Sequence, residues 1–299
     1  MKRVFIIGNG FDLAHGLKTG YFAFRDFLKS TDRPFYDQIK EYNLFEGDDL
    51  WRNFESNLSK IDVETLTSYA NLRCNDDMDY DSMEGDNIDI AVAEELNYID
   101  GLSEKIREWV SGTVDLSACN KIIASSYLKD SLWLTFNYTH TLEDLYEIDP
   151  NSILHIHGDA ENYYEELIMG HGNDEDIAEI ENECQSLYSG REYGAKKAVV
   201  KYLQKSRKPV TNLIENHEAY FKDYESADEI YILGFSFGDV DMPYVEKIAS
   251  ESPKATIYVS FYDVNSIPEF LNKMMKYIER IKFFKIEGLG SYPPTYVLK

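Results

Sequence analysis

Cysteine is scarce in this chain, which has only three cysteines in 299 residues. Cys74, Cys119 and Cys184 lie far apart and form no C-x-x-C pair, which argues against a disulfide framework or a structural zinc site. Long apolar runs are also missing, because none approaches the roughly 20 residues that a membrane-spanning helix needs. An apolar strand, Val4–Ile7, begins almost at the N-terminus and leaves no room for a signal peptide. We therefore expect a cytoplasmic protein without a membrane segment.

Basic residues are few beside the acidic ones: 30 Lys and Arg against 54 Asp and Glu give a net charge of −24. This charge repels nucleic-acid phosphates and argues against direct nucleic-acid binding. We interpret the one dense basic group as a solvated helix face that balances nearby acids; it comprises Lys196, Lys197, Lys201, Lys205, Arg207 and Lys208. The acidic run at 75–89 matches no calcium-loop pattern, so we interpret it as an exposed loop.

Short apolar runs alternate with helical stretches along much of the chain. The strand candidates are Val4–Ile7, Ser131–Phe136, Ile153–Ile156, Leu167–Met169, Glu229–Leu233, Thr256–Phe261 and Ile281–Ile286. This alternation predicts an α/β fold, Rossmann-like, with a mostly parallel sheet and helices on both faces. Two stretches without strand character, about 30–117 and 174–224, are predicted to be helical insertions in a single domain that covers 1–299.

Four of the predicted strands end in polar or glycine-containing loops. These loops are GNGFD at 8–12, FNYTH at 136–140, HGD at 157–159 and GFSFGD at 234–239. Ligands of open α/β sheets bind beyond the carboxyl ends of the strands, so we expect the four loops to converge. Their side chains suit ribose hydroxyls and an amide-bearing base, and their glycines suit phosphates; the side chains are Asn9, Asn137, Ser236, Asp12, Asp239 and Asp241.

The first of these loops does not complete a dinucleotide-binding fingerprint. Leu13 stands where G-x-G-x-x-G requires its last glycine, three residues after Gly10. A buried first strand followed by a tight turn explains Gly8-Asn9-Gly10 equally well. The convergence of several loops is therefore more informative than this motif by itself.

The same segments resemble a known family. GNGFD followed by GLKTGYFAF, and WRNFE at 51–55, are similar to motifs of the AbiH abortive-infection family, which is similar to the sirtuin-like NAD-binding superfamily. TFNYT at 135–139, the His-Gly pair at 157–158 and GFSFGDVD at 234–241 follow in the order of sirtuin motifs.

The resemblance implies roles for particular residues. Asn137 faces the nicotinamide ribose and, with His157 as the general base, forms the catalytic pair. Gly8, Asn9, Gly10 and Asp12 line the phosphates and the neighbouring ribose of the dinucleotide. The same motifs assign further NAD contacts to Phe11, Thr19, Tyr21, Thr139, Gly234, Ser236, Asp239 and Asp241.

The departures from the sirtuin pattern narrow the expected reaction. Thr139 replaces an acid, Asp12 replaces a serine, and the missing C-x-x-C pairs remove the zinc ribbon that frames a sirtuin's peptide groove. Deacylation of protein lysines is therefore disfavoured, and hydrolysis of NAD is the simpler inference. The resemblance thus implies a cytoplasmic antiphage effector that destroys NAD and stops the metabolism of the infected cell.

Several alternatives remain open from the residues alone. The chain is also compatible with a nucleotide sensor without turnover, with another nucleotide hydrolase or transferase, or with an acidic DNA mimic that uses the 75–89 run. Effectors of this kind often form a homo-oligomer or are held by a regulatory partner protein, and no segment marks such an interface.

The histidines and one glutamate also have ordinary structural interpretations. His155 and His157 flank Ile156 on a short strand and point to opposite faces, and Gly158 at the strand end favours His157 as the site residue. A metal site made of His155, His157 and His171 matches no standard spacing, so no metal is predicted. Glu55 is a secondary candidate for a carboxylate pair with Asp12, although a helix-surface position explains it as well.

Overall fold

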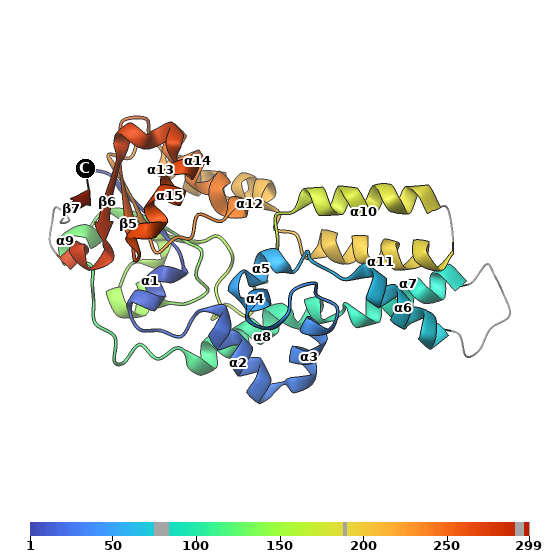
Figure 1. The fold of residues 1–299 in the computed structure, drawn as a ribbon. Coiled ribbons are helices and arrows are strands. Elements are labelled where there is room, and N and C mark those ends of the chain that lie inside the picture. Colours follow the sequence, from blue (N-terminus) through green and yellow to red (C-terminus); the bar gives the residue numbers. More distant parts are fainter. Residues whose placement is uncertain (75–83, 188–189, 291–295, 299) are drawn as a thin grey trace. The chain divides into compact units, whose positions relative to one another are not determined.

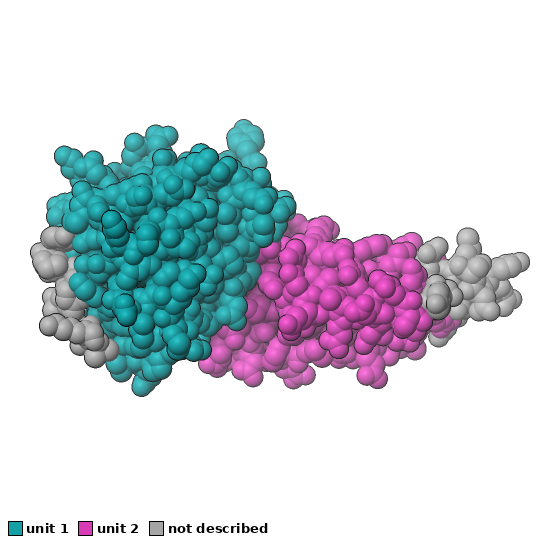
Figure 2. Space-filling model, turned by 90° about the horizontal axis from the view of Figure 1, so that it is seen from above, with its two compact units in different colours: residues 1–20, 110–167, 209–299 teal, residues 21–109, 168–208 magenta. Residues whose placement is uncertain are grey.

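The computed structural model describes residues 1–299 except 75–83, 188–189, 291–295 and 299 (Figure 1). Its chain forms two compact units, which Figure 2 colours separately. Unit 1 contains residues 1–20, 110–167 and 209–299, and unit 2 contains residues 21–109 and 168–208. Unit 2 overlaps most of the two expected insertions, whereas residues 110–117 and 209–224 belong to unit 1.

Unit 1 is built on a seven-stranded sheet with the order β3-β2-β1-β4-β5-β6-β7. The strands are β1 Arg3–Ile7, β2 Ser131–Thr135, β3 Ile153–His155, β4 Glu229–Leu233, β5 Thr256–Phe261, β6 Ile281–Lys285 and β7 Tyr296–Leu298. The first six strands pair in parallel, and β7 pairs antiparallel with β6. The order of the six parallel strands is that of a Rossmann fold, in which the winding reverses beside β1. The predicted α/β class with a mostly parallel sheet is therefore confirmed.

An aromatic ladder crosses the middle of this sheet. Phe5 on β1 is in register with Trp133 on β2 and with Tyr231 on β4, and Tyr231 is in register with Tyr258 on β5. The rings stack with centroid separations of 4.2 Å, 4.8 Å and 4.6 Å along this row. Alternate residues of a strand face the same side, so the register itself brings these rings together. The ladder fixes the register at the strands whose ends carry the candidate site.

Each unit has its own set of helices (Figure 1). Unit 1 has the short helices α1 Asn9–Ala14, α9 Ser125–Leu128, α12 Val210–Asn216, α13 Glu218–Tyr224, α14 Met242–Glu251 and α15 Ile267–Lys273, and a π-helical turn, η1 Thr141–Leu145. Unit 2 has α2 Tyr21–Thr31, α3 Arg33–Glu41, α4 Gly47–Arg52, α5 Phe54–Asn57, α6 Val63–Cys74, α7 Glu84–Glu95, α10 Asp174–Leu187 and α11 Arg191–Lys205. Helix α8, Tyr98–Thr113, crosses the boundary between the units.

Two local expectations are wrong. Leu167–Met169 forms no strand; its first residue is buried, and a Cβ on Gly158 would lie only 3.2 Å from Leu167 Cδ2, so Leu167 packs against the turn after β3. The second expectation is an exposed loop for the acidic run at 75–89. Residues 75–83 lie outside the described residues, and residues 84–89 form the start of α7. In that helix Asp89 is buried and pairs with Lys197 at 3.0 Å and Lys201 at 3.1 Å.

Candidate functional site

The loops after β1 and β4 touch at the point where the winding of the sheet reverses. Gly8 N donates to Leu233 O at 2.9 Å, and Gly10 N donates to Gly234 O at 2.8 Å. A Cβ on Gly10 would lie 2.7 Å from Gly234 Cα, and one on Gly234, whose φ is +60°, would lie 2.1 Å from Phe11 N. Only glycine permits this approach. Close loop packing thus accounts for these glycines, and the two N–H groups are used within the fold.

A buried polar cluster surrounds Asp12, which lies in the first turns of α1. One carboxylate oxygen accepts from Thr139 Oγ1 at 2.6 Å, and the other accepts from Thr141 Oγ1 at 2.8 Å. Burial disfavours the ionised carboxylate and raises its pKa to about 6, although hydrogen bonds from Thr139, Thr141 and Asn137 oppose the shift. A carboxylate that titrates near neutrality in a polar cluster is a feature of functional sites.

Asn137 connects this cluster to the first glycine turn. Its side-chain Nδ2 donates to Gly8 O at 3.2 Å, and its backbone N donates to Thr135 Oγ1 at 3.1 Å. Because β1 and β2 are neighbouring parallel strands, their carboxyl ends bring Asn137 and Asp12 to the same edge. Four sequence-predicted residues therefore meet here: Gly8, Asp12, Asn137 and Thr139. Thr141 belongs to the same cluster and was missed, because its hydroxyl lies two residues beyond the recognised motif.

His157 lies in a separate contact group of unit 1. Its Nε2 is 3.6 Å from Asp241 Oδ1, and its ring packs edge-on against Phe136 with a centroid separation of 5.1 Å. Tyr244 of α14 lies on the same imidazole, with a centroid separation of 6.1 Å. The residue is only 2% exposed, so a substrate reaches it only after a neighbouring side chain moves. The structure thus brings the predicted His157 together with the predicted Asp241.

The other predicted residues have different surroundings. Phe11 is buried against His15, and Asn9 and Thr19 are half-buried. Ser236 is exposed, and the Asp239 carboxylate, 92% exposed, pairs with Lys273 Nζ at 2.9 Å. Asn9, Thr19, Ser236 and Asp239 thus do not share the buried environment of Asp12.

Tyr21 belongs to unit 2, where it joins a charged pair. Its hydroxyl donates to Glu55, and Glu55 pairs with Lys208 Nζ at 2.6 Å. The Lys208 side chain is 1% exposed, so its interpretation as part of a solvated basic face is wrong. The basic run in the sequence suggested that Lys208 lies on the surface of α11, but Lys208 follows the end of this helix. His171, also in unit 2, has both ring nitrogens engaged: Nε2 with Leu203 O at 3.0 Å, and Nδ1 accepting from Asn173 N at 3.1 Å.

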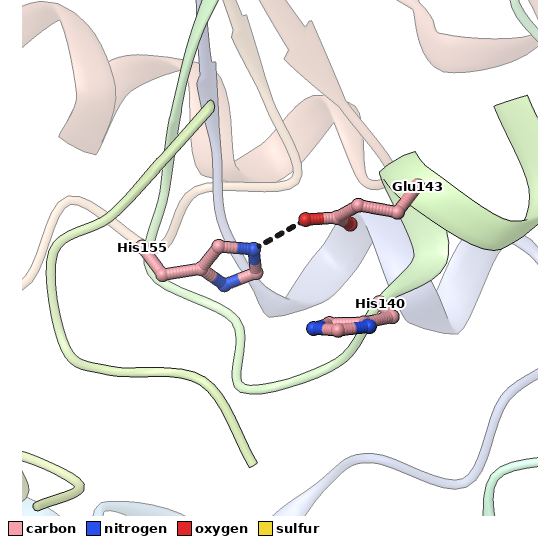
Figure 3. A group of neighbouring side chains, drawn as sticks. All are labelled: His140, Glu143 and His155. Atoms are coloured by element: carbon pink, nitrogen blue, oxygen red, sulfur yellow. Dashed lines mark hydrogen bonds and ion pairs between the residues drawn. The ribbon is translucent and has the colours of Figure 1, made fainter. Parts of the chain in front are cut away.

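Another group of ionisable side chains, His140, Glu143 and His155, lies in unit 1 (Figure 3). His155 Nδ1 is 3.1 Å from Asn137 O, and its Nε2 is 2.8 Å from Glu143 Oε1. His140 lies beside this pair, and its nitrogens contact Asp159 at 2.7 Å and Glu161 at 3.1 Å. The hydrogen bond to Asp159 raises the pKa of His140 to about 9. Neither His140 nor Glu143 was assigned from sequence, although they lie three residues apart after a predicted strand.

Two hollows in the described part of the chain lie elsewhere. One, of about 550 Å³, lies in unit 2 along α10 and α11 and is lined by Glu181, Cys184, Gln185, Tyr193, Lys197, Val200 and Lys201. The other, of about 420 Å³, follows the ends of β5 and β6 and is lined by Phe261, Tyr262, Asp263, Lys285, Ile286 and Glu287. Neither is lined by the Asp12 cluster or by His157.

The fold and the cluster together define a Rossmann-like α/β protein with a buried acid at the carboxyl ends of its central strands. Residues 4–262 match the family described as bacteriophage abortive infection AbiH, and the chain belongs to this family. The match indicates an antiphage role in abortive infection. A comparison with curated proteins gives no match. Within the described residues, no helix combines the length and apolarity required to cross a bilayer.

Proposed function

We propose that this protein is an abortive-infection effector that binds NAD at the edge formed by the β1 and β2 loops and hydrolyses its N-glycosidic bond. The observation that supports this proposal most is the buried cluster of Asp12, Asn137 and Thr139. In a sheet of Rossmann order this is the edge where nucleotides bind. Hydroxyl, amide and carboxylate groups are also the partners that ribose hydroxyls require.

In the proposed reaction the protein orients the substrate and accepts a proton. Water attacks the anomeric carbon of the nicotinamide ribose, the glycosidic bond breaks, and nicotinamide leaves with the bonding electron pair. Asn137 and Asp12 orient the ribose, and His157 accepts the proton that the water loses. Asp241, 3.6 Å from His157 Nε2, stabilises the imidazolium that forms.

Measuring NAD in phage-infected cells tests this proposal, because infection supplies any trigger that the effector needs. We expect wild-type protein to deplete NAD and to release nicotinamide. His157→Ala removes the general base, so we expect this variant to react about 10²–10⁴-fold more slowly. Asn137→Ala is expected to slow it as well, and His217→Ala, which changes a histidine outside the site, serves as the matched control. Unchanged NAD loss with His157→Ala, or unchanged NAD in cells that the wild-type protein protects, contradicts the assignment.

The burial of His157 favours one second candidate, a nucleotide sensor without turnover. Such a sensor binds NAD or ADP-ribose and transmits a change of shape. A ligand that binds only the native state raises the melting temperature. A raised melting temperature with intact NAD in infected, protected cells identifies the sensor.

A further inference from the structure

We propose that His140, Glu143 and His155 form a binding site for a divalent first-row transition-metal ion. Each of the three side chains offers one ligand atom, and these atoms all lie within 4.8 Å of one another (Figure 3). All three are partly buried residues of unit 1. The inference does not depend on the proposed hydrolysis of NAD.

The hydrogen bonds of His155 leave a lone pair directed at a carboxylate. The carbonyl oxygen of Asn137 only accepts, so His155 Nδ1, 3.1 Å away, carries a proton. In the neutral ring, Nε2 then has a lone pair, yet it faces Glu143 Oε1 at 2.8 Å. At this distance the two atoms share either a proton, as in an imidazolium–carboxylate pair, or a metal ion. A metal ion satisfies both atoms, and an Nδ1–H bond to a backbone carbonyl is the usual way in which proteins orient a ligating histidine.

Glu143 has a second oxygen that points to the same conclusion. Oε2 is shielded from solvent and has no hydrogen-bond partner among the described residues. A buried, unsatisfied carboxylate oxygen is unfavourable in a folded protein. Coordination of a metal by both oxygens of Glu143, or by one with water on the other, removes this penalty.

His140 completes the site with a carboxylate behind it. One of its nitrogens exchanges its proton for the metal, and the other keeps a carboxylate partner, Asp159 or Glu161. Carboxylate–histidine–metal arrangements of this kind raise the basicity of the ligand and fix its ring.

The backbone explains why these side chains meet. β2 and β3 are parallel neighbours with Thr135 in register with His155, so the end of β3 lies beside the loop that follows β2. His140 precedes the turn η1 and Glu143 lies within it. The end of β3 therefore supplies His155, and the segment that follows β2 supplies His140 and Glu143.

The donor set selects the class of ion. Two imidazoles and one carboxylate suit Mn²⁺, Fe²⁺, Co²⁺ or Zn²⁺, whereas Mg²⁺ and Ca²⁺ prefer all-oxygen ligands. Three protein ligands also leave coordination positions for water or for a substrate oxygen.

Calorimetric titration of chelator-treated, tag-free protein with Mn²⁺, Co²⁺ and Zn²⁺ tests the site. We expect one ion per chain and a rise in melting temperature on binding, with no competition from Mg²⁺ or Ca²⁺ at equal concentration. Glu143→Gln and His155→Ala should each weaken binding by about 100-fold or more, because each removes one of the three ligands.

The net charge of −24 holds cations loosely elsewhere, so the difference between variants is the decisive reading. His217→Ala is the matched control and should bind as wild type does. Glu143→Gln keeps the size of the side chain, and its circular dichroism without metal shows that it is folded. Absence of binding by wild-type protein, equal affinity in Glu143→Gln and His155→Ala, or preference for Mg²⁺ or Ca²⁺ each overturns the proposal.

Discussion

The carboxyl group of Asp12 is ionisable yet fully buried, and burial raises its pKa from 3.8 to about 6. The folded protein therefore binds this proton more tightly than the unfolded chain does. The stability that the neutral form contributes is fully present below pH 3.8 and is lost as the pH rises through about 6. At neutral pH the ionised Asp12 thus lowers the free energy of unfolding.

Asp12→Asn removes this pH-dependent penalty and keeps the shape of the side chain. Its amide can exchange hydrogen bonds with the hydroxyls of Thr139 and Thr141. We expect the variant to be more stable than wild type by about 3 kcal/mol at pH 7 and above, because one pKa unit corresponds to about 1.4 kcal/mol. Below pH 4 the two proteins should converge. Urea unfolding across this range measures the difference, and a wild-type protein that gains on the variant with rising pH would refute the assignment.

Some residues were not predictable one at a time, because their surroundings come from distant segments. The raised pKa of His140 comes from Asp159, and its place beside His155 comes from the pairing of β2 with β3. The basic run in the sequence favours a surface position for Lys208, and its ion pair with Glu55 comes from the fold. Residue type and local spacing did predict that Asp12 and Asn137 lie at the same edge of the sheet, since both belong to motifs at strand ends.

At the level of elements, apolar runs predicted the parallel strands well. A strand buried on both faces has a continuous apolar sequence, as β4 shows at residues 230–233. The apolar run at Leu167–Met169 has only three residues, too few to identify a strand. Leu167 is buried because it packs against the turn at Gly158. The antiparallel β7 has only three residues and gave no comparable pattern.

A substitution at Gly234 tests the contact between the loops that follow β1 and β4. Gly234→Ala adds a Cβ that would lie 2.1 Å from Phe11 N, at a φ of +60°. We expect a loss of about 2–5 kcal/mol from the backbone strain and the overpacking together. Gly16→Ala is the control, because Gly16 also has a positive φ, +81°, but nothing lies within 4 Å of its added Cβ.

Urea unfolding of both glycine variants separates the two contributions. The control should lose only about 1–2 kcal/mol, the backbone share of the effect. Equal losses at the two positions would show that the loops do not approach each other as closely as described.

For the whole molecule, the net charge of −24 is the dominant electrostatic fact. Self-repulsion of like charges destabilises a compact state, and salt screens it. Raising NaCl from about 0.01 M to about 1 M shortens the Debye length from about 30 Å to about 3 Å. We expect the melting temperature to rise by several degrees, at about 2–4 °C per kcal/mol for a chain of this size. A fall with salt would instead mean that attractive ion pairs outweigh the repulsion.

Strand β1, which lies inside the sheet between β2 and β4, is made before every other strand. β1 ends at Ile7, but its two neighbours begin only at Ser131 and Glu229. At translation rates of about 5–20 residues per second, this apolar segment waits many seconds for either partner. Its hydrogen-bonding edges stay open for that time, which makes the newly made β1 segment a binding target for chaperones and a starting point for aggregation.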